Sequence, residues 1–330
     1  MKKELLLATT VTGLVLGATS ASAVTSTLSG NHRVGLLDID RDSSTATTGT
    51  TNENIQSSFA VALEETTDAG TKIAGSFTLM SEGSAFKNSP SGITLTFTDG
   101  SSLELISAGN ATKDHDVAVP GVSGEMSLGQ SSSNSAAVGI DGVGASNAVS
   151  FAWHSAADVA GIDGASISIS YSNGDETAVA TGTSKVDSSW SAGVTYVTTT
   201  GDTTVTIGGG YMMAEDSNTT TVNDRSNEVA IAMSAATGDL TVGVGFASGS
   251  YMDANSGASA EVDGAEAITA GAKYVSGDIT FAVGYVDGSG KDIATFGSDG
   301  TNTDSYESIG ASIDYVVAPG VTATLGYTSV

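Results

Sequence analysis

The sequence predicts an all-β chain that crosses a membrane as an antiparallel barrel of strands. Beyond residue 23, apolar residues alternate with small polar ones at a period of two, which is typical of strands whose two faces meet different surroundings. Short turns and long polar loops alternate between these strands. No later segment has the roughly 20 apolar residues that a spanning helix needs, so a membrane could be crossed only by strands.

Composition excludes several classes of protein. The chain of 330 residues has 37 acidic and 11 basic side chains and a formal net charge of -26, so a nucleic acid would be repelled. It contains no cysteine, which excludes a disulfide scaffold or a cysteine-ligated zinc site. Hydrophobic residues make up 39% of the chain, which argues against extensive disorder.

The first 23 residues have the features of a secretory signal peptide. Lys2 and Lys3 precede a largely apolar run from Leu5 to Leu16, and Ala21-Ser22-Ala23 supplies the small residues of a cleavage site. We therefore predict export and cleavage after Ala23, with residues 24–330 forming the barrel.

Fifteen segments carry the strand pattern. The second and third illustrate it, because Phe59, Val61 and Leu63 share one face and a short turn leads into Ile73 and Phe77. The predicted strands are 27–37, 55–63, 73–79, 93–97, 103–105, 149–153, 167–171, 190–196, 205–211, 229–233, 242–246, 268–274, 279–285, 309–315 and 321–327.

The connections between hairpins are long and polar. They are predicted at 40–54, 81–92, 110–147, 173–187, 212–226, 248–264 and 287–305. Outer-membrane barrels have this asymmetry of short periplasmic turns and longer external loops. A soluble sandwich can alternate as cleanly. Two features favour the barrel: Ser, Thr, Ala and Gly dominate the second face, and tyrosines recur at the strand margins, at Tyr196, Tyr211, Tyr274, Tyr285, Tyr315 and Tyr327.

Two local matches resemble a known family. Residues 28–35 (LSGNHRVG) are similar to the opening strand of the general porins of the α-proteobacterial branch, and residues 59–77 resemble the first periplasmic hairpin of that family. The resemblance implies a sixteen-stranded barrel in the outer membrane of a Gram-negative cell, usually a homotrimer. It also implies a third external loop that folds inward and narrows a water-filled pore. The corresponding loop here is 110–147, which carries Asp114, Asp116, Glu125 and Asp141.

The chain departs from the family pattern in two respects. Family members often set basic wall residues against the acidic third loop, whereas the strands here offer only Arg33, Lys72 and Lys273. Fifteen strands would also leave the two chain ends on opposite sides of the membrane, with two unpaired edges in hydrocarbon. We therefore expect that one external loop and the closing strand are missing from this sequence.

Nothing in the sequence indicates an enzyme or a required cofactor. The three histidines, His32, His115 and His154, form no HExxH motif, and each is interpreted as a solvated or interfacial residue. The run of Gly208, Gly209 and Gly210 opens no helix and fits strand positions where a barrel bends or a neighbour approaches.

One motif suggests weak divalent-cation binding. Asp38, Asp40 and Asp42 match the first three ligand positions of a calcium loop, but Ser43 and Gly49 break the remainder of that motif.

The function that these observations predict is passive diffusion of ions and small hydrophilic solutes. An acidic vestibule focuses an electric field that attracts cations, so a cation preference is expected. Arg33 and Lys72 on the wall and the four loop carboxylates are the predicted selectivity residues. The alternative is a secreted, acidic, β-rich surface or adhesin-like protein, against which stands the absence of a fixed repeat.

Overall fold

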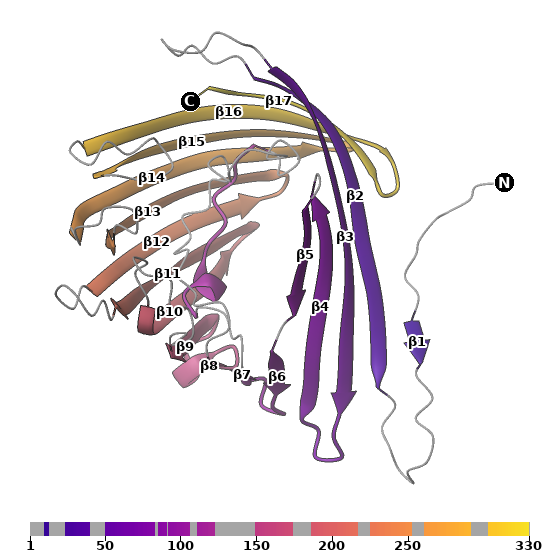
Figure 1. Cartoon of the computed structure of the whole chain (residues 1–330), viewed down its shortest axis with the longest axis vertical. Coiled ribbons are helices and arrows are strands. Elements are labelled where there is room, and N and C mark those ends of the chain that lie inside the picture. The colour runs from indigo at the N-terminus through magenta and orange to yellow at the C-terminus, as the bar shows by residue number, and fades with distance from the viewer. Residues whose placement is uncertain are drawn as a thin grey trace.

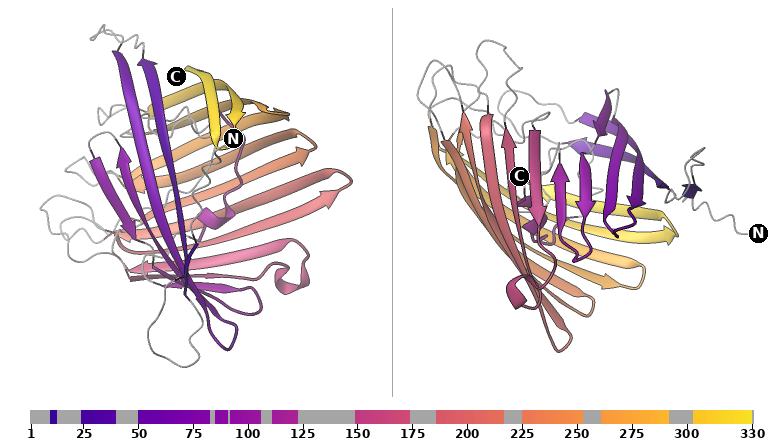
Figure 2. Two further views of the ribbon diagram at one scale, coloured as in Figure 1. Left: turned by 90° about the vertical axis from the view of Figure 1, so that its right-hand side faces the viewer. Right: turned by 90° about the horizontal axis from the view of Figure 1, so that it is seen from below.

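The computed structural model is one curved antiparallel sheet that forms an open cup (Figure 1). It describes residues 10–12, 24–39, 50–82, 85–90, 92–105, 111–122, 149–173, 186–216, 225–252, 261–291 and 303–329. Consecutive strands pair along the chain from β2 to β17. Figure 2 shows the sheet from two further sides, with short turns gathered along one rim.

The first half of the sheet contains eight strands and two short 3-10 helices. The bounds are β2 (Thr25–Ile39), β3 (Thr50–Thr66), β4 (Lys72–Glu82), β5 (Ala85–Pro90), β6 (Ile93–Thr96), β7 (Ser102–Leu105), η1 (Lys113–His115), β8 (Val149–His154), η3 (Val159–Gly161) and β9 (Ala165–Asn173). A further three-residue strand, β1 (Thr10–Thr12), lies within the predicted signal segment and pairs with β2.

The second half is a regular meander of longer strands. These are β10 (Val186–Thr200), β11 (Thr203–Asp216), β12 (Arg225–Thr237), β13 (Leu240–Met252), β14 (Glu261–Ser276), β15 (Ile279–Lys291), β16 (Thr303–Ala318) and β17 (Val321–Ser329).

The predicted number of strands is confirmed, but one predicted connection is wrong. β5 and β6 both pair with β4, so together they form one interrupted strand, and fifteen strands follow the signal segment. Residues 85–90 were expected in the connection 81–92. They lie in β5 because their backbone pairs with residues 77–82 of β4, although the segment lacks the apolar alternation. Backbone hydrogen bonds also extend β3 to residue 50, inside the predicted loop 40–54.

Large apolar side chains lie on the outside of this sheet. In β12, Ile231 is 55% exposed, whereas the flanking Ala230 and Ala232 are 4% and 5% exposed. This distribution is the reverse of a soluble core, in which large apolar side chains are the most buried. The convex face is therefore apolar and the concave face carries small and polar residues, which confirms the alternation predicted for a membrane barrel.

The short turns are closed by glycine where the backbone requires a positive φ. Gly100 has φ 89°, and its N–H donates to the carbonyl of Phe97 at 3.0 Å. In the same turn, both the N–H and the hydroxyl of Ser101 donate to Asp99 Oδ1, at 2.9 and 2.7 Å. These bonds stabilise the ionised carboxylate, and they hold the pKa of Asp99 below its usual value.

The meander begins at β2 and ends at β17 without closing. Registers join each strand to the next, with β5 and β6 both pairing with β4, and none joins β17 to β2 among the described residues. Large apolar side chains of β17 are the most exposed in the described part of the chain, with Leu325 at 75% and Tyr327 at 70%. No helix within the described ranges has the length and apolar character to span a membrane.

Candidate functional site

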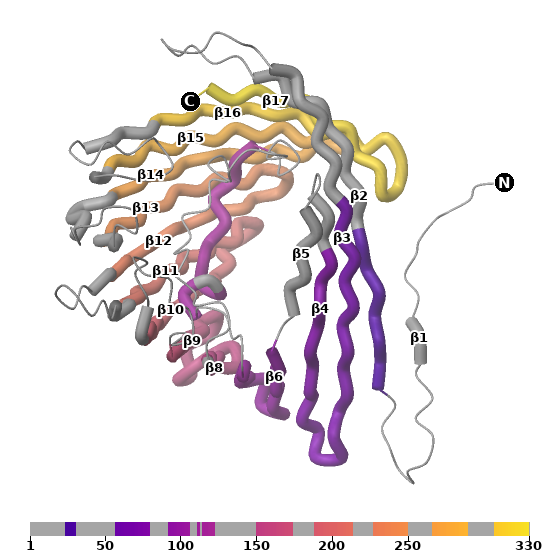
Figure 3. Tube along the Cα trace, in the orientation of Figure 1, coloured from indigo at the N-terminus to yellow at the C-terminus, as the bar shows by residue number. Residues whose placement is uncertain are grey.

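A segment of the third loop, residues 111–122, crosses the concave face of the sheet. Figure 3 shows it running from β9 towards β16 on the inner side of the cup. Its side chains are buried against the wall: Ala111 is 0% exposed, Thr112 1% and His115 3%. Val117 and Val119 pack on Ala232 of β12. Part of the predicted constriction loop 110–147 therefore lies inside the cup.

Glycines on the wall make room for this segment. A Cβ atom added to Gly210 would lie 2.6 Å from Thr112 Cγ2, and one on Gly243 would lie 2.9 Å from Pro120 Cδ. A Cβ on Gly271 would collide with the carbonyl oxygen of Pro120. The loop backbone can therefore approach the sheet only because these positions have no side chain.

The glycines are aligned by the strand registers. Gly243 of β13 pairs with Gly271 of β14, which in turn pairs with Gly284 of β15, and Gly284 pairs with Gly310 of β16. We call these four residues the glycine row. It runs across four strands, and Pro120, Gly121 and Val122 lie against it. The prediction that strand glycines mark a close neighbour is confirmed at Gly208 and Gly210, where the neighbour is the loop.

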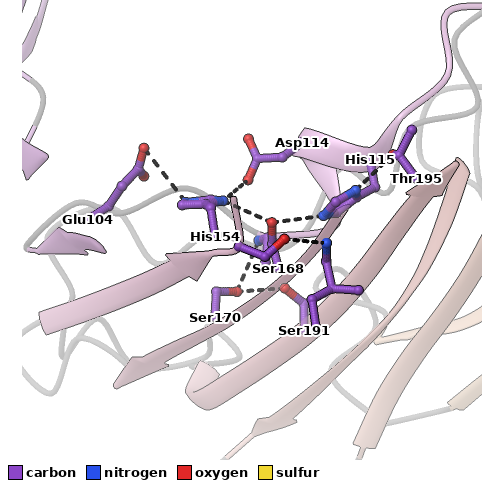
Figure 4. A network of polar contacts seen from close by, with 11 residues as sticks. Glu104, Asp114, His115, His154, Ser168, Ser170, Ser191 and Thr195 are labelled. Atoms are coloured by element: carbon purple, nitrogen blue, oxygen red, sulfur yellow. Dashed lines mark hydrogen bonds and ion pairs between the residues drawn. The ribbon is translucent and has the colours of Figure 1, made fainter. Parts of the chain in front are cut away.

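His115 attaches the loop to two strands. Its Nε2 lies 2.8 Å from Ser168 Oγ of β9, and its Nδ1 lies 2.8 Å from Thr195 Oγ1 of β10 (Figure 4). Its ring also fills the space above Gly193, where a Cβ would collide with it. One turn earlier, the Ala111 N–H donates to Ser170 Oγ at 3.0 Å. These contacts fix the start of the segment on the wall.

A second histidine lies beside the loop between two carboxylates. His154 Nδ1 is 3.2 Å from Asp114 Oδ2, and its Nε2 is 3.9 Å from Glu104 Oε1 of β7. The same Nδ1 is 2.9 Å from Ser168 Oγ, so Ser168 touches both histidines. Figure 4 shows the continuous set of contacts from Glu104 through His154 and Ser168 to His115. The interpretation of His115 and His154 as solvated or interfacial residues is therefore wrong, because strand pairing places His154, and the loop places His115, beside the hydroxyl of Ser168.

Desolvation and neighbouring charges shift the pKa values of Asp114 and His115. Desolvation raises the pKa of Asp114, partly offset by the attraction of His154, while repulsion from Glu104 raises it further. Desolvation lowers the pKa of His115, and the charge of His154 lowers it again. His115 is therefore held neutral, and Asp114 gives up its proton at a higher pH than an ordinary aspartate.

The predicted selectivity residues fall in different places. Asp114 lies in the cluster with His154, and Asp116 is half-buried just beyond η1. Lys72 lies on β4, two strands from Glu104, since it pairs with Thr96 of β6, which pairs with Ser102 of β7. Its Nζ is 2.7 Å from Glu64 Oε2 across the first hairpin. Its charge is thus offset by a neighbouring carboxylate. Lys273 is exposed on β14.

Other predicted residues lie outside the described part of the chain. Glu125, Asp141, Asp40 and Asp42 are among these. The backbones of Arg33 and Asp38 lie in β2, opposite Gln56 and Thr51, but their side chains are outside the description. Within the described ranges, no three His, Asp or Glu side chains are grouped to hold a metal ion.

Sequence reasoning missed Glu104, His154 and Ser168. Each lies on the polar face of a correctly predicted strand, or next to its end, and the cross-strand registers bring them together. Glu104 pairs with Ala152, two residues before His154, and His154 pairs with Ser168. The sequence did contain one sign of this cluster: Glu104 is a charged residue between Leu103 and Leu105 in a strand whose other residues are uncharged.

A family model described as Gram-negative porin matches residues 8–330. The chain belongs to the Gram-negative porin family. Porins are channels of the outer membrane, so this porin is located there and passes small solutes. The family assignment also replaces the alternative of a secreted adhesin-like protein.

Solved structures show the same fold at low sequence identity. This porin is similar to OmpF of Salmonella typhi in complex with daunomycin, with a TM-score of 0.64 and 12% identity over 93% of this chain and 90% of that chain. It is similar to a porin refined at 1.8 Å resolution, with a TM-score of 0.62 and 15% identity over 92% and 95% of the two chains. It is also similar to a variant of the Rh. blastica porin, with a TM-score of 0.55 and 18% identity over 92% of this chain and 94% of that chain. No curated protein matches the chain in sequence.

Proposed function

We propose that this porin is a passive channel for ions and small hydrophilic solutes with a modest preference for cations. The observation that carries the proposal is the concave wall itself. Small polar residues line it, and the loop that crosses it brings Asp114 next to Glu104. His154 lies against both carboxylates. A cleft with one sign of charge concentrates ions of the opposite sign.

We predict that several further residues contribute to this cation preference. Asp116, Glu125 and Asp141 would add negative charge to the same loop, and Arg33 would oppose it from the wall. The contribution of Lys72 should be small, because its ion pair with Glu64 leaves little net charge. Weak calcium binding by Asp38, Asp40 and Asp42 remains a prediction, and no cofactor is required for diffusion.

We expect the purified porin to prefer cations in a planar bilayer. In a gradient of potassium chloride, the sign of the reversal potential should show this preference. The preference should weaken as salt rises, because the Debye length falls from about 30 Å at 0.01 M to about 3 Å at 1 M. Reversal potentials at both ends of this range test the expectation. Anion preference at low salt would contradict the proposed cation selectivity, while a lack of any conductance would contradict the channel.

We also propose that the porin assembles as a homotrimer in outer-membrane lipid. The exposed apolar residues of the convex face would then be shared between lipid and neighbouring subunits. Light scattering in detergent, corrected for bound detergent, should give three times the mass of one chain. That mass is 32.6 kDa for the sequence that includes the signal peptide. A monomer mass under mild detergent would contradict this assembly.

A further inference from the structure

The two histidines of the cluster have opposite surroundings although one hydroxyl joins them. Both ring nitrogens of His115 face hydroxyls, those of Ser168 and Thr195. The ring of His154 has a carboxylate near each nitrogen: Nδ1 is 3.2 Å from Asp114 Oδ2 as well as 2.9 Å from Ser168 Oγ, and Nε2 is 3.9 Å from Glu104 Oε1. Hydroxyls suit a neutral ring, which donates once and accepts once, whereas carboxylates suit an imidazolium, which donates from both nitrogens.

The hydrogen bonds also discourage a proton on both rings. An ionised carboxylate only accepts, so the contact with Asp114 places a hydrogen on His154 Nδ1. Ser168 then accepts from His154 and donates to His115 Nε2. A proton added to His115 would turn Nε2 into a second donor towards the same hydroxyl. The extra proton therefore belongs on His154: its Nε2 makes no hydrogen bond within the described structure, and the carboxylate of Glu104, 3.9 Å away, is the group that offsets the added charge.

We propose that His154 and Glu104 are specificity-determining residues of the pore, and that a proton on His154 weakens the cation preference set by Asp114 and Glu104. This inference rests on the proposed channel function. The titratable groups placed against His154 are Glu104 from β7 and Asp114 and His115 from η1, while β9 contributes Ser168. Acidification adds a positive charge between the two carboxylates, so the net charge facing a passing cation becomes less negative. His115 meanwhile stays neutral and holds the loop in place.

The test measures reversal potentials at low salt at pH 8 and at pH 5 for the wild-type channel and for His154→Gln. Glutamine can donate to Asp114 and Ser168 but takes no proton in this range. We expect the cation-to-anion permeability ratio of the wild type to fall by about fivefold, the factor given by about 1 kcal/mol for two unit charges 4 Å apart in water. In the His154→Gln channel most of this fall should be lost, so that its permeability ratio differs little between pH 8 and pH 5.

Further variants separate the contributing groups. Glu104→Gln should lower the permeability ratio already at pH 8, because one carboxylate is gone. Any decrease in the permeability ratio between pH 8 and pH 5 that remains in His154→Gln would come from protonation of carboxylates, including Asp114. A full fall in His154→Gln, or a wild-type preference that does not change between pH 8 and pH 5, would overturn the inference while leaving the channel intact. A wild type without cation preference at pH 8 would instead overturn the proposed function.

Discussion

Gly271→Ala is expected to lower the unitary conductance of the channel and to increase its open-channel noise. The added methyl group would collide with the Pro120 carbonyl oxygen, and neither a Cβ atom nor a backbone carbonyl can rotate away by a change of side-chain rotamer. Because the wall is a paired strand between Gly243 and Gly284, the loop must give way and move towards the lumen. Overpacking of this kind typically costs about 1–3 kcal/mol.

The matched control for this variant is Gly288→Ala. Gly288 lies on β15 four residues after Gly284 and on the same face, but its added Cβ would meet nothing closer than the Glu266 oxygen at 3.4 Å. That distance is ordinary contact, so conductance should remain at the wild-type value. Heat-modifiable migration in detergent gels would show that both variants form folded sheets. Equal conductance of Gly271→Ala and Gly288→Ala would show that the loop does not depend on the glycine row.

Phe59→Lys is expected to impair assembly of the porin into membranes severely. Phe59 is 43% exposed on the convex face of β3, next to Ala60 on the concave face. A lysine facing lipid near the middle of the bilayer costs about 2–4 kcal/mol in a β-barrel. Yield of heat-modifiable protein after refolding into lipid vesicles measures this effect.

Ala60→Lys provides the comparison at nearly the same depth. Its lysine would face the water-filled side, and no described contact of residues 111–122 reaches β3. We expect near-normal assembly together with a weaker cation preference, because a positive charge has been added to the wall. If both variants assembled equally well, the convex face would not be the lipid-facing surface.

The fold was predictable because strand alternation is a local property of the sequence. The six tight turns marked by a glycine, from residues 66–70 to Pro319-Gly320, lie where the sequence places them. The failure at residues 85–90 has a physical cause: β5 has no apolar face, and it is a strand only because β4 offers it backbone partners. Such pairing is a tertiary effect that no local pattern contains.

The site was predictable only in part, since it depends on registers between strands. Asp114 could be proposed from its place in the longest loop. The meeting of Glu104, His154 and Ser168 requires knowing that residue 104 lies opposite 152 and residue 154 opposite 168. A shift of one residue in either pairing would turn a member of the cluster to the lipid side. Likewise, four separated glycines give no sign in the sequence that they form one row.

The glycine row limits how the width of this passage can change during evolution. A wall position occupied by hydrogen can only gain atoms on substitution, and at Gly271 even one carbon collides with the segment above it. Substitutions in the glycine row can thus obstruct the passage but cannot enlarge it. Adaptation to bulkier nutrients would have to proceed through the loop side chains that face the open water, such as the exposed Asp114 and Ala118.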